Sequence, residues 1–97
     1  MKVVWTPDAK DTYEQNIAYL ANEWDEGVIE NFIEKIAESV SYIQKNPALY
    51  PFYNKRKKIR KCVVVRQISL YYRVTETHIE ILLCWNNYQD PKKLKFK

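Results

Sequence analysis

The side chains best suited to chemistry in this sequence are cations and phenols, and the cations gather in one stretch. Seven cations and no acid lie between residues 55 and 66: Lys55, Arg56, Lys57, Lys58, Arg60, Lys61 and Arg66. Such a cluster creates a strongly positive potential that favours nucleic acid or an acidic protein as a partner, although many basic surfaces are only solvated. We predict that these seven residues, together with Arg73, form a surface that binds a target or nucleic acid.

Cations and phenols can also cleave RNA without a metal ion. In that reaction Lys or Arg stabilises the charge that develops around phosphorus, and a Lys or Tyr with a shifted pKa transfers the protons. If the protein is a ribonuclease, we predict Arg60, Arg73 and Tyr88 as its catalytic residues. The sequence has no Gly-rich phosphate loop, no metal-ligand spacing and no Ser/His/Asp set, so we expect neither a metal nor a cofactor.

The remaining reactive side chains are one histidine and two cysteines. His78 has no base or metal ligand near it in the sequence, and we expect it to be solvated in a turn. Cys62 and Cys84 lie in apolar runs without a CxxC or Cys/His spacing, which predicts two reduced, buried thiols in a cytoplasmic protein. No run approaches the ~18 apolar residues of a membrane span, and the N-terminus does not resemble an export signal.

The net charge of +4 divides unevenly along the 97 residues. Residues 1–50 contain four cations and nine acids, whereas residues 51–97 contain twelve cations and three acids, for net charges of −5 and +9. This asymmetry favours an anionic partner for the C-terminal half. The length and the 46% hydrophobic content predict a single globular domain over residues 1–97.

A strand over residues 2–5 and two helices are predicted in the first half. Thr6 and Pro7 suit a helix start, with Thr as the cap and Pro in the first turn. Apolar residues spaced by three or four follow, on one face: Ala9, Tyr13, Ile17, Leu20 and Trp24. A second such face begins after Asp25 and ends before Pro47: Ile29, Phe32, Ile33, Ile36, Val40 and Ile43. The short break around Gly27 predicts an antiparallel helix hairpin.

Three strands are predicted in the second half, over residues 59–65, 68–74 and 79–85, and the first two form a hairpin. In the second strand, alternation places Ser69, Tyr71 and Arg73 on a polar face that is available for chemistry. In the third, it places Ile79, Ile81, Leu83 and Trp85 together, and apolar residues on both faces indicate a central, covered strand.

Residues 48–54 are predicted to form a loop. Its aromatic side chains either anchor the loop to the domain or provide stacking platforms for bases, and we favour anchoring. The tail after Asn86 is too short to define and could be frayed. The fold class that follows is α+β, with the N-terminal strand and the antiparallel two-helix hairpin packed on a mainly antiparallel sheet.

Four phrases in this order resemble the RelE/ParE superfamily of bacterial toxins from type II toxin-antitoxin systems: VVWTPDAKDTYEQNIAYL, ENFIEKIAESVSYIQKNPALYP, IRKCVVVRQISLYYRV and EILLCWNNYQDPKKL. The resemblance covers nearly the whole chain. It implies a small cytoplasmic toxin that is neutralised by a cognate acidic antitoxin, with a toxin-antitoxin heterotetramer as a possible assembly and no membrane contact.

The superfamily divides by target. RelE-type members are similar to ribonucleases that cut mRNA on the ribosome with basic residues on successive strands. Arg60 suits the first of those positions, but the others fall at Cys62, near Ser69 and near Tyr88. ParE-type members are associated with inhibition of DNA gyrase, and this chain looks closer to them. We therefore expect a gyrase inhibitor, with a ribosome-dependent mRNA endoribonuclease, or a non-toxic RNA- or antitoxin-binding module, as the alternatives.

Overall fold

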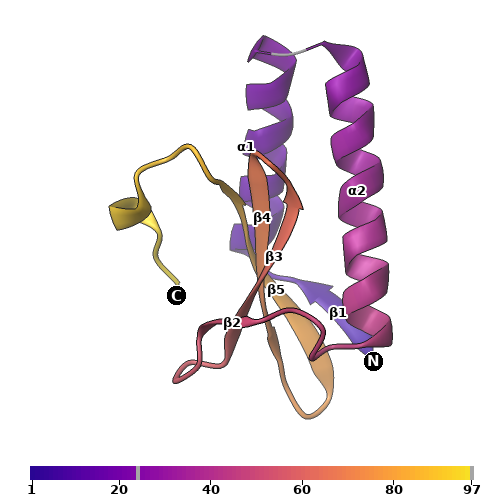
Figure 1. Cartoon of the computed structure of the whole chain (residues 1–97), viewed down its shortest axis with the longest axis vertical. Helices are drawn as coiled ribbons and strands as arrows, with labels where there is room; N and C mark the ends of the chain where they lie inside the picture. The colour runs from indigo at the N-terminus through magenta and orange to yellow at the C-terminus, as the bar shows by residue number, and fades with distance from the viewer. Residues whose placement is uncertain (24, 97) are drawn as a thin grey trace.

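The computed structural model describes residues 1–23 and 25–96, so Trp24 and Lys97 lie outside the described residues. Its elements follow in chain order: β1 (Lys2–Trp5), α1 (Pro7–Glu23), α2 (Glu26–Lys45), β2 (Phe52–Asn54), β3 (Ile59–Val65), β4 (Ile68–Val74), β5 (His78–Asn86) and a 3-10 turn, η1 (Pro91–Lys93). The strands form one sheet in the order β1-β5-β4-β3-β2, in which only β1 pairs in parallel. The predicted α+β class is confirmed (Figure 1).

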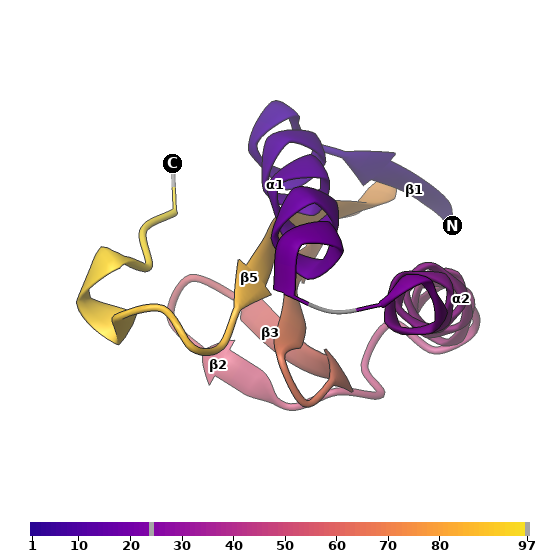
Figure 2. The same cartoon turned by 90° about the horizontal axis from the view of Figure 1, so that it is seen from above.

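Both helices begin, and α2 ends, as the sequence predicts, although Gly27, which was placed in the break between them, lies in the first turn of α2. The Ala9 amide donates to Thr6 Oγ1 at 3.2 Å, and the Val28 amide donates to Asp25 Oδ1 at 3.1 Å. Each cap satisfies an amide that has no partner inside its helix. The helices run antiparallel beside the sheet, and the view from above shows them side by side (Figure 2).

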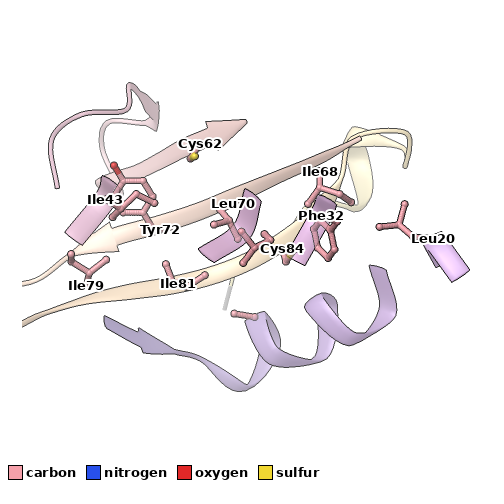
Figure 3. Close-up of a cluster of buried hydrophobic side chains, with 12 residues drawn as sticks. Leu20, Phe32, Ile43, Cys62, Ile68, Leu70, Tyr72, Ile79, Ile81 and Cys84 are labelled. Carbon is pink, nitrogen blue, oxygen red and sulfur yellow. The ribbon is translucent and has the colours of Figure 1, made fainter. Parts of the chain in front are cut away.

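The main core lies between the helices and one face of the sheet, which we call the helix face. Leu20 and Phe32 from the helices pack with Leu70, Tyr72 and further residues of the central strands (Figure 3). The Tyr72 hydroxyl donates to the Pro47 carbonyl at 2.8 Å, which ties the end of α2 to the sheet. Ile33 departs from its predicted place in the core, since 43% of it is exposed.

Side chains of α1 also complete the backbone hydrogen bonds of β5. Strand β1 pairs with β5 only as far as Ile81. Beyond that point the Cys84 amide donates to Thr12 Oγ1 at 2.9 Å, and Asn16 Nδ2 donates to the Cys84 carbonyl at 2.7 Å. The buried Asn16 therefore replaces the missing strand partner.

A β-bulge in β5 changes which residues face the helices. Tyr71 pairs with Leu83 and Tyr72 with Ile81, so Leu82 is an extra residue without an opposite partner. Leu83 and Trp85 consequently pack on the other face of the sheet, away from Ile81. The prediction that all of these residues share one face is wrong because it assumed strict alternation.

The second face of the sheet, which we call the open face, has a smaller core of its own. Tyr71 packs there with Leu82 and Leu83, and residues of the C-terminal tail cover them, with the Phe96 ring 5.3 Å from that of Tyr71. Tyr71 and Ser69 are buried. The prediction of a polar face available for chemistry is therefore wrong at these two positions, and the tail packs against the sheet instead of fraying.

Two smaller predictions are also corrected. The loop predicted over residues 48–54 contains the edge strand β2, because residues 52–54 pair with β3. His78 begins β5 instead of lying in a turn, and its Nδ1 lies 2.8 Å from Thr77 Oγ1.

Cys62 and Cys84 are free and buried, as predicted. Among the described residues, no helix is long and apolar enough to cross a membrane.

Candidate functional site

Four of the predicted binding residues form the turn between β2 and β3, which we call the basic turn: Lys55, Arg56, Lys57 and Lys58. The Lys57 amide donates to Asn54 Oδ1 at 3.0 Å, and the Lys58 amide donates to the Lys55 carbonyl at 3.1 Å. Lys58 has a φ of 59°, in the left-handed region that disfavours residues with a Cβ. All four side chains are exposed, and none of them takes part in an ion pair within the described residues.

Arg60 lies on the helix face next to this turn, where it holds the preceding loop. Its Nη1 donates to the Tyr50 carbonyl at 2.6 Å and lies 3.4 Å from the Ala48 carbonyl. The guanidinium carbon sits 3.8 Å from the centre of the Phe52 ring, within cation–π range. Arg60 therefore already has partners inside the protein.

Arg73 lies on the open face, because it pairs with Ile59 in the strand register. Its Nη2 and Nε lie 3.1 and 3.2 Å from Glu80 Oε1. His78 Nε2 lies 3.6 Å from the other oxygen of Glu80, so one carboxylate joins a guanidinium and an imidazole. Glu80 was not among the predicted site residues, although the three-residue connection between β4 and β5 places it opposite Arg73.

Tyr88 and Arg66 lie at the other end of the sheet. Tyr88 follows β5, and the neighbouring Asn87 donates through its amide to the Gln67 carbonyl at 2.7 Å and through Nδ2 to the Arg66 carbonyl. Ile68, beside this end, and Arg73 are five positions apart along β4, which corresponds to roughly 16 Å along a strand. The structure brings Arg60 close to the basic turn, but it does not bring Arg60, Arg73 and Tyr88 together.

The aromatic residues of β2 anchor the strand, as the sequence analysis favoured, and they remain partly exposed. Tyr53 packs edge-on against Tyr71, with ring centres 4.9 Å apart, and thereby anchors the strand. It is nevertheless 48% exposed, and Phe52 is 40% exposed. Val63, which was not among the predicted site residues, is 60% exposed beside them.

Burial keeps the inner phenols and thiols protonated. Loss of water raises the pKa of Tyr71 to about 12 and that of Tyr50 to about 12. Burial also raises the pKa of Cys84 to about 12 and raises the pKa of Cys62. None of these four groups is a ready proton acceptor at neutral pH. No cluster of three or more potential metal ligands occurs in the described part of the chain.

Comparison with known proteins identifies a family whose model matches this chain. The family model for the ParE toxin of the type II toxin-antitoxin system parDE matches residues 3–90. A search of curated protein sequences finds no match.

Solved structures share the fold at low sequence identity. A chain of the chromosomal ParDE system from P. aeruginosa has a TM-score of 0.74 and 18% identity, over 89% of this chain and 95% of its own. The YoeB/ParE toxin from Agrobacterium tumefaciens has a TM-score of 0.64 and 18% identity, over 91% and 100%. The heterotetrameric YoeB-YefM toxin-antitoxin complex from Staphylococcus aureus contains a chain with a TM-score of 0.59 and 19% identity, over 91% and 98%. Because the family model spans most of the chain and the fold agrees, the chain belongs to the ParE toxin family of type II toxin-antitoxin systems.

Proposed function

We propose that this toxin arrests growth in the cytoplasm by binding DNA gyrase and that it cleaves no RNA itself. The observation that carries the proposal is the separation of Arg60, Arg73 and Tyr88. A metal-free ribonuclease needs its cations and its proton-transfer groups within hydrogen-bonding distance of one phosphate. Arg60 and Arg73 lie on opposite faces of the sheet, and Tyr88 lies at its far end.

The contacts of the two arginines support the same conclusion. Arg60 already donates to a loop carbonyl, and Arg73 is paired with Glu80. A phosphate would have to compete with these contacts for the two guanidinium groups. In addition, the buried phenols have raised pKa values, which opposes a role as a base.

The basic turn is the surface that we assign to gyrase. Its four cations are exposed on a short turn that hydrogen bonds from two backbone amides hold in place, one to the Asn54 side chain and one to the Lys55 carbonyl. Four like charges on consecutive residues repel one another, which costs stability unless a partner neutralises them. We expect an acidic surface of gyrase, or DNA bound to it, to be that partner.

The same charge argues for an acidic antitoxin. A segment with several Asp or Glu residues that covers the basic turn would neutralise it and exclude gyrase. The YoeB-YefM complex of similar fold is a heterotetramer, and we propose a comparable toxin-antitoxin assembly here.

The test is a supercoiling assay with purified gyrase and purified toxin. We expect the wild-type chain to inhibit supercoiling, and we expect the double variant Lys55→Gln/Arg56→Gln to need at least about tenfold more protein, because each lost contact is worth about 1 kcal/mol. Lys92→Gln/Lys93→Gln is the matched control, since it removes two exposed cations from η1. It should inhibit like the wild type. Undisturbed supercoiling at toxin concentrations that arrest growth would rule out gyrase as the target.

Mapping of RNA ends after induction tests the enzymatic alternative. We expect no toxin-dependent cleavage of mRNA in arrested cells. Codon-phased ends on ribosome-bound mRNA that disappear in Arg73→Ala would establish a ribonuclease instead. Normal growth after induction would indicate a binding module without toxicity.

A further inference from the structure

We propose that the β2 edge of the sheet is a binding site for single-stranded nucleic acid. In this site a base stacks on the exposed aromatic rings of β2, and the adjacent phosphates contact Lys61 and the basic turn. We call the group formed by Phe52, Tyr53, Lys61 and Val63 the β2 shelf. The proposal goes beyond gyrase inhibition and does not depend on it.

The shelf has the size and lining that a nucleobase requires. A shallow pocket of about 460 Å³ lies against it, lined by Phe52, Tyr53, Val63 and Lys61 with the chain at residues 50 and 51. Phe52, Tyr53 and Val63 are 40%, 48% and 60% exposed, although each is large and apolar. Neighbouring apolar side chains that stay this exposed together mark a place where another molecule binds.

The ring contacts leave stacking surface free. The Tyr53 ring meets the Tyr71 ring at 76° and the Phe96 ring, 6.0 Å away, at 55°, yet 48% of Tyr53 stays exposed. The Arg60 guanidinium occupies only one side of the Phe52 ring. Aromatic rings that are anchored to the protein and still exposed are the stacking platforms of proteins that bind single strands.

The charge around the shelf fits a phosphate backbone. The sequence contains no acid between Glu38 and Glu76, a span that includes all of β2, the basic turn and β3. Lys61 lines the pocket, with its Nζ 5.9 Å from the centre of the Tyr71 ring. On the other side of β2 a second pocket of about 230 Å³ is lined by Phe52 with Lys58 and Arg60. Cations therefore flank the aromatic strand on both sides.

The combination favours a single strand over a duplex or an acidic peptide. The bases of a duplex are stacked on one another and cannot reach Tyr53, and a peptide carboxylate would use the cations without the rings. The side chains that line the pocket include no carboxylate or amide that could hydrogen-bond to the 2′-hydroxyl by which RNA differs from DNA. The site is therefore expected to bind DNA and RNA strands similarly.

The experiment measures the fluorescence anisotropy of labelled oligothymidine of about 12 nucleotides with the full-length toxin and no gyrase. We expect binding that weakens as salt rises from about 50 to 200 mM, and an oligouridine of equal length should bind within about threefold. The matching dT/dA duplex should bind at least about tenfold more weakly. A duplex that binds as tightly as the single strand would overturn the proposal, as would polyglutamate that binds as tightly as the oligonucleotide.

Two exposed valines provide a matched pair of variants. Val63→Glu places a carboxylate on the shelf and should weaken oligothymidine binding at least about tenfold. Val4→Glu makes the same change of charge on the exposed strand β1, at the opposite edge of the sheet, and should bind within about twofold of wild type. Tyr53→Leu removes the ring and should weaken binding about tenfold at unchanged net charge. Equal binding by Val63→Glu and Val4→Glu, with both variants folded by thermal melt, would contradict the site.

Discussion

The two faces of the sheet differ in how they are covered. The helix face lies under α1 and α2, and its central residues, such as Leu70, Tyr72 and Ile81, are completely buried. The open face lies under a tail that contains one 3-10 turn, and Leu82 and Leu83 remain 9% and 7% exposed. This difference indicates that the helix face supplies most of the stability. The thinner cover leaves the edge of the open face near β2 accessible to partners.

The largest expected effect comes from truncating one residue on each face of the same strand. We expect Ile81→Ala to lower the free energy of unfolding by about 3–4 kcal/mol, because the rigid core cannot fill the space. Leu83→Ala should cost about 2 kcal/mol, since the tail can move toward the gap. Urea denaturation of both variants measures the difference. Equal losses would show that the tail packs as firmly as the helices.

Alkaline pH tests the burial of the helix face. Burial raises the pKa of Cys84 from 9.0 to about 12, so the unfolded thiol loses its proton at a lower pH than the folded one. The contribution of this thiol to the free energy of unfolding is fully present below pH 9. It is lost as the pH rises toward 12, by up to about 1.4 kcal/mol per pH unit.

We therefore expect the free energy of unfolding of the wild type to fall between pH 9 and 10, where Cys62 and the buried tyrosines contribute as well because burial raises their pKa too. In Cys84→Ala the decline should be smaller by about 1 kcal/mol over that unit. Chemical denaturation at each pH measures both slopes. Identical slopes in the two proteins would mean that water reaches the thiol in the folded state.

Much of the fold follows from local patterns in the sequence. Thr6, Asp25 and Pro47 mark the helix ends, and β-branched runs mark β3, β4 and β5. The bulge at Leu82 is different, because an inserted residue leaves the apolar run unchanged. The role of Asn16 is equally hidden, since its partner is a backbone carbonyl 68 residues away. Both features depend on pairing between distant segments.

The candidate site was predictable in composition but less so in geometry. The four consecutive cations at residues 55–58 predict an exposed turn, because no other segment of the chain has as many charged residues in a row. The hydrogen-bond and ion-pair partners of Arg60 and Arg73 cannot be predicted from composition in this way. Strand alternation places these two arginines on opposite faces only once the register of β3 and β4 is known. That register separates the cations that a ribonuclease would need to bring together.

The two arginines provide the next comparison. We expect Arg60→Ala to cost about 1–2 kcal/mol, because it leaves the Tyr50 carbonyl without its charged donor and removes the cation–π contact with Phe52. Arg73→Ala should cost about 0.5 kcal/mol or less, since solvent screens its partly exposed pair with Glu80. Thermal melts measure both changes, and limited proteolysis should show faster cleavage within residues 47–54 only in Arg60→Ala. A larger loss in Arg73→Ala would contradict the structural role of Arg60.

The smallest expected effect separates backbone from charge in the basic turn. Lys58 holds a φ of 59°, which costs a residue with a Cβ about 1 kcal/mol, whereas Gly adopts it freely. Lys58→Gly should therefore raise the free energy of unfolding by up to about 0.5 kcal/mol after the greater flexibility of unfolded Gly is counted. Lys57→Gly removes the same charge from a neighbouring position without a positive φ and should lower it by about 0.5 kcal/mol. Denaturation of both variants at high salt removes the shared effect of charge. Opposite signs would establish that backbone strain at Lys58 is maintained in the folded turn, while equal signs would show that the positive φ of Lys58 stores no strain.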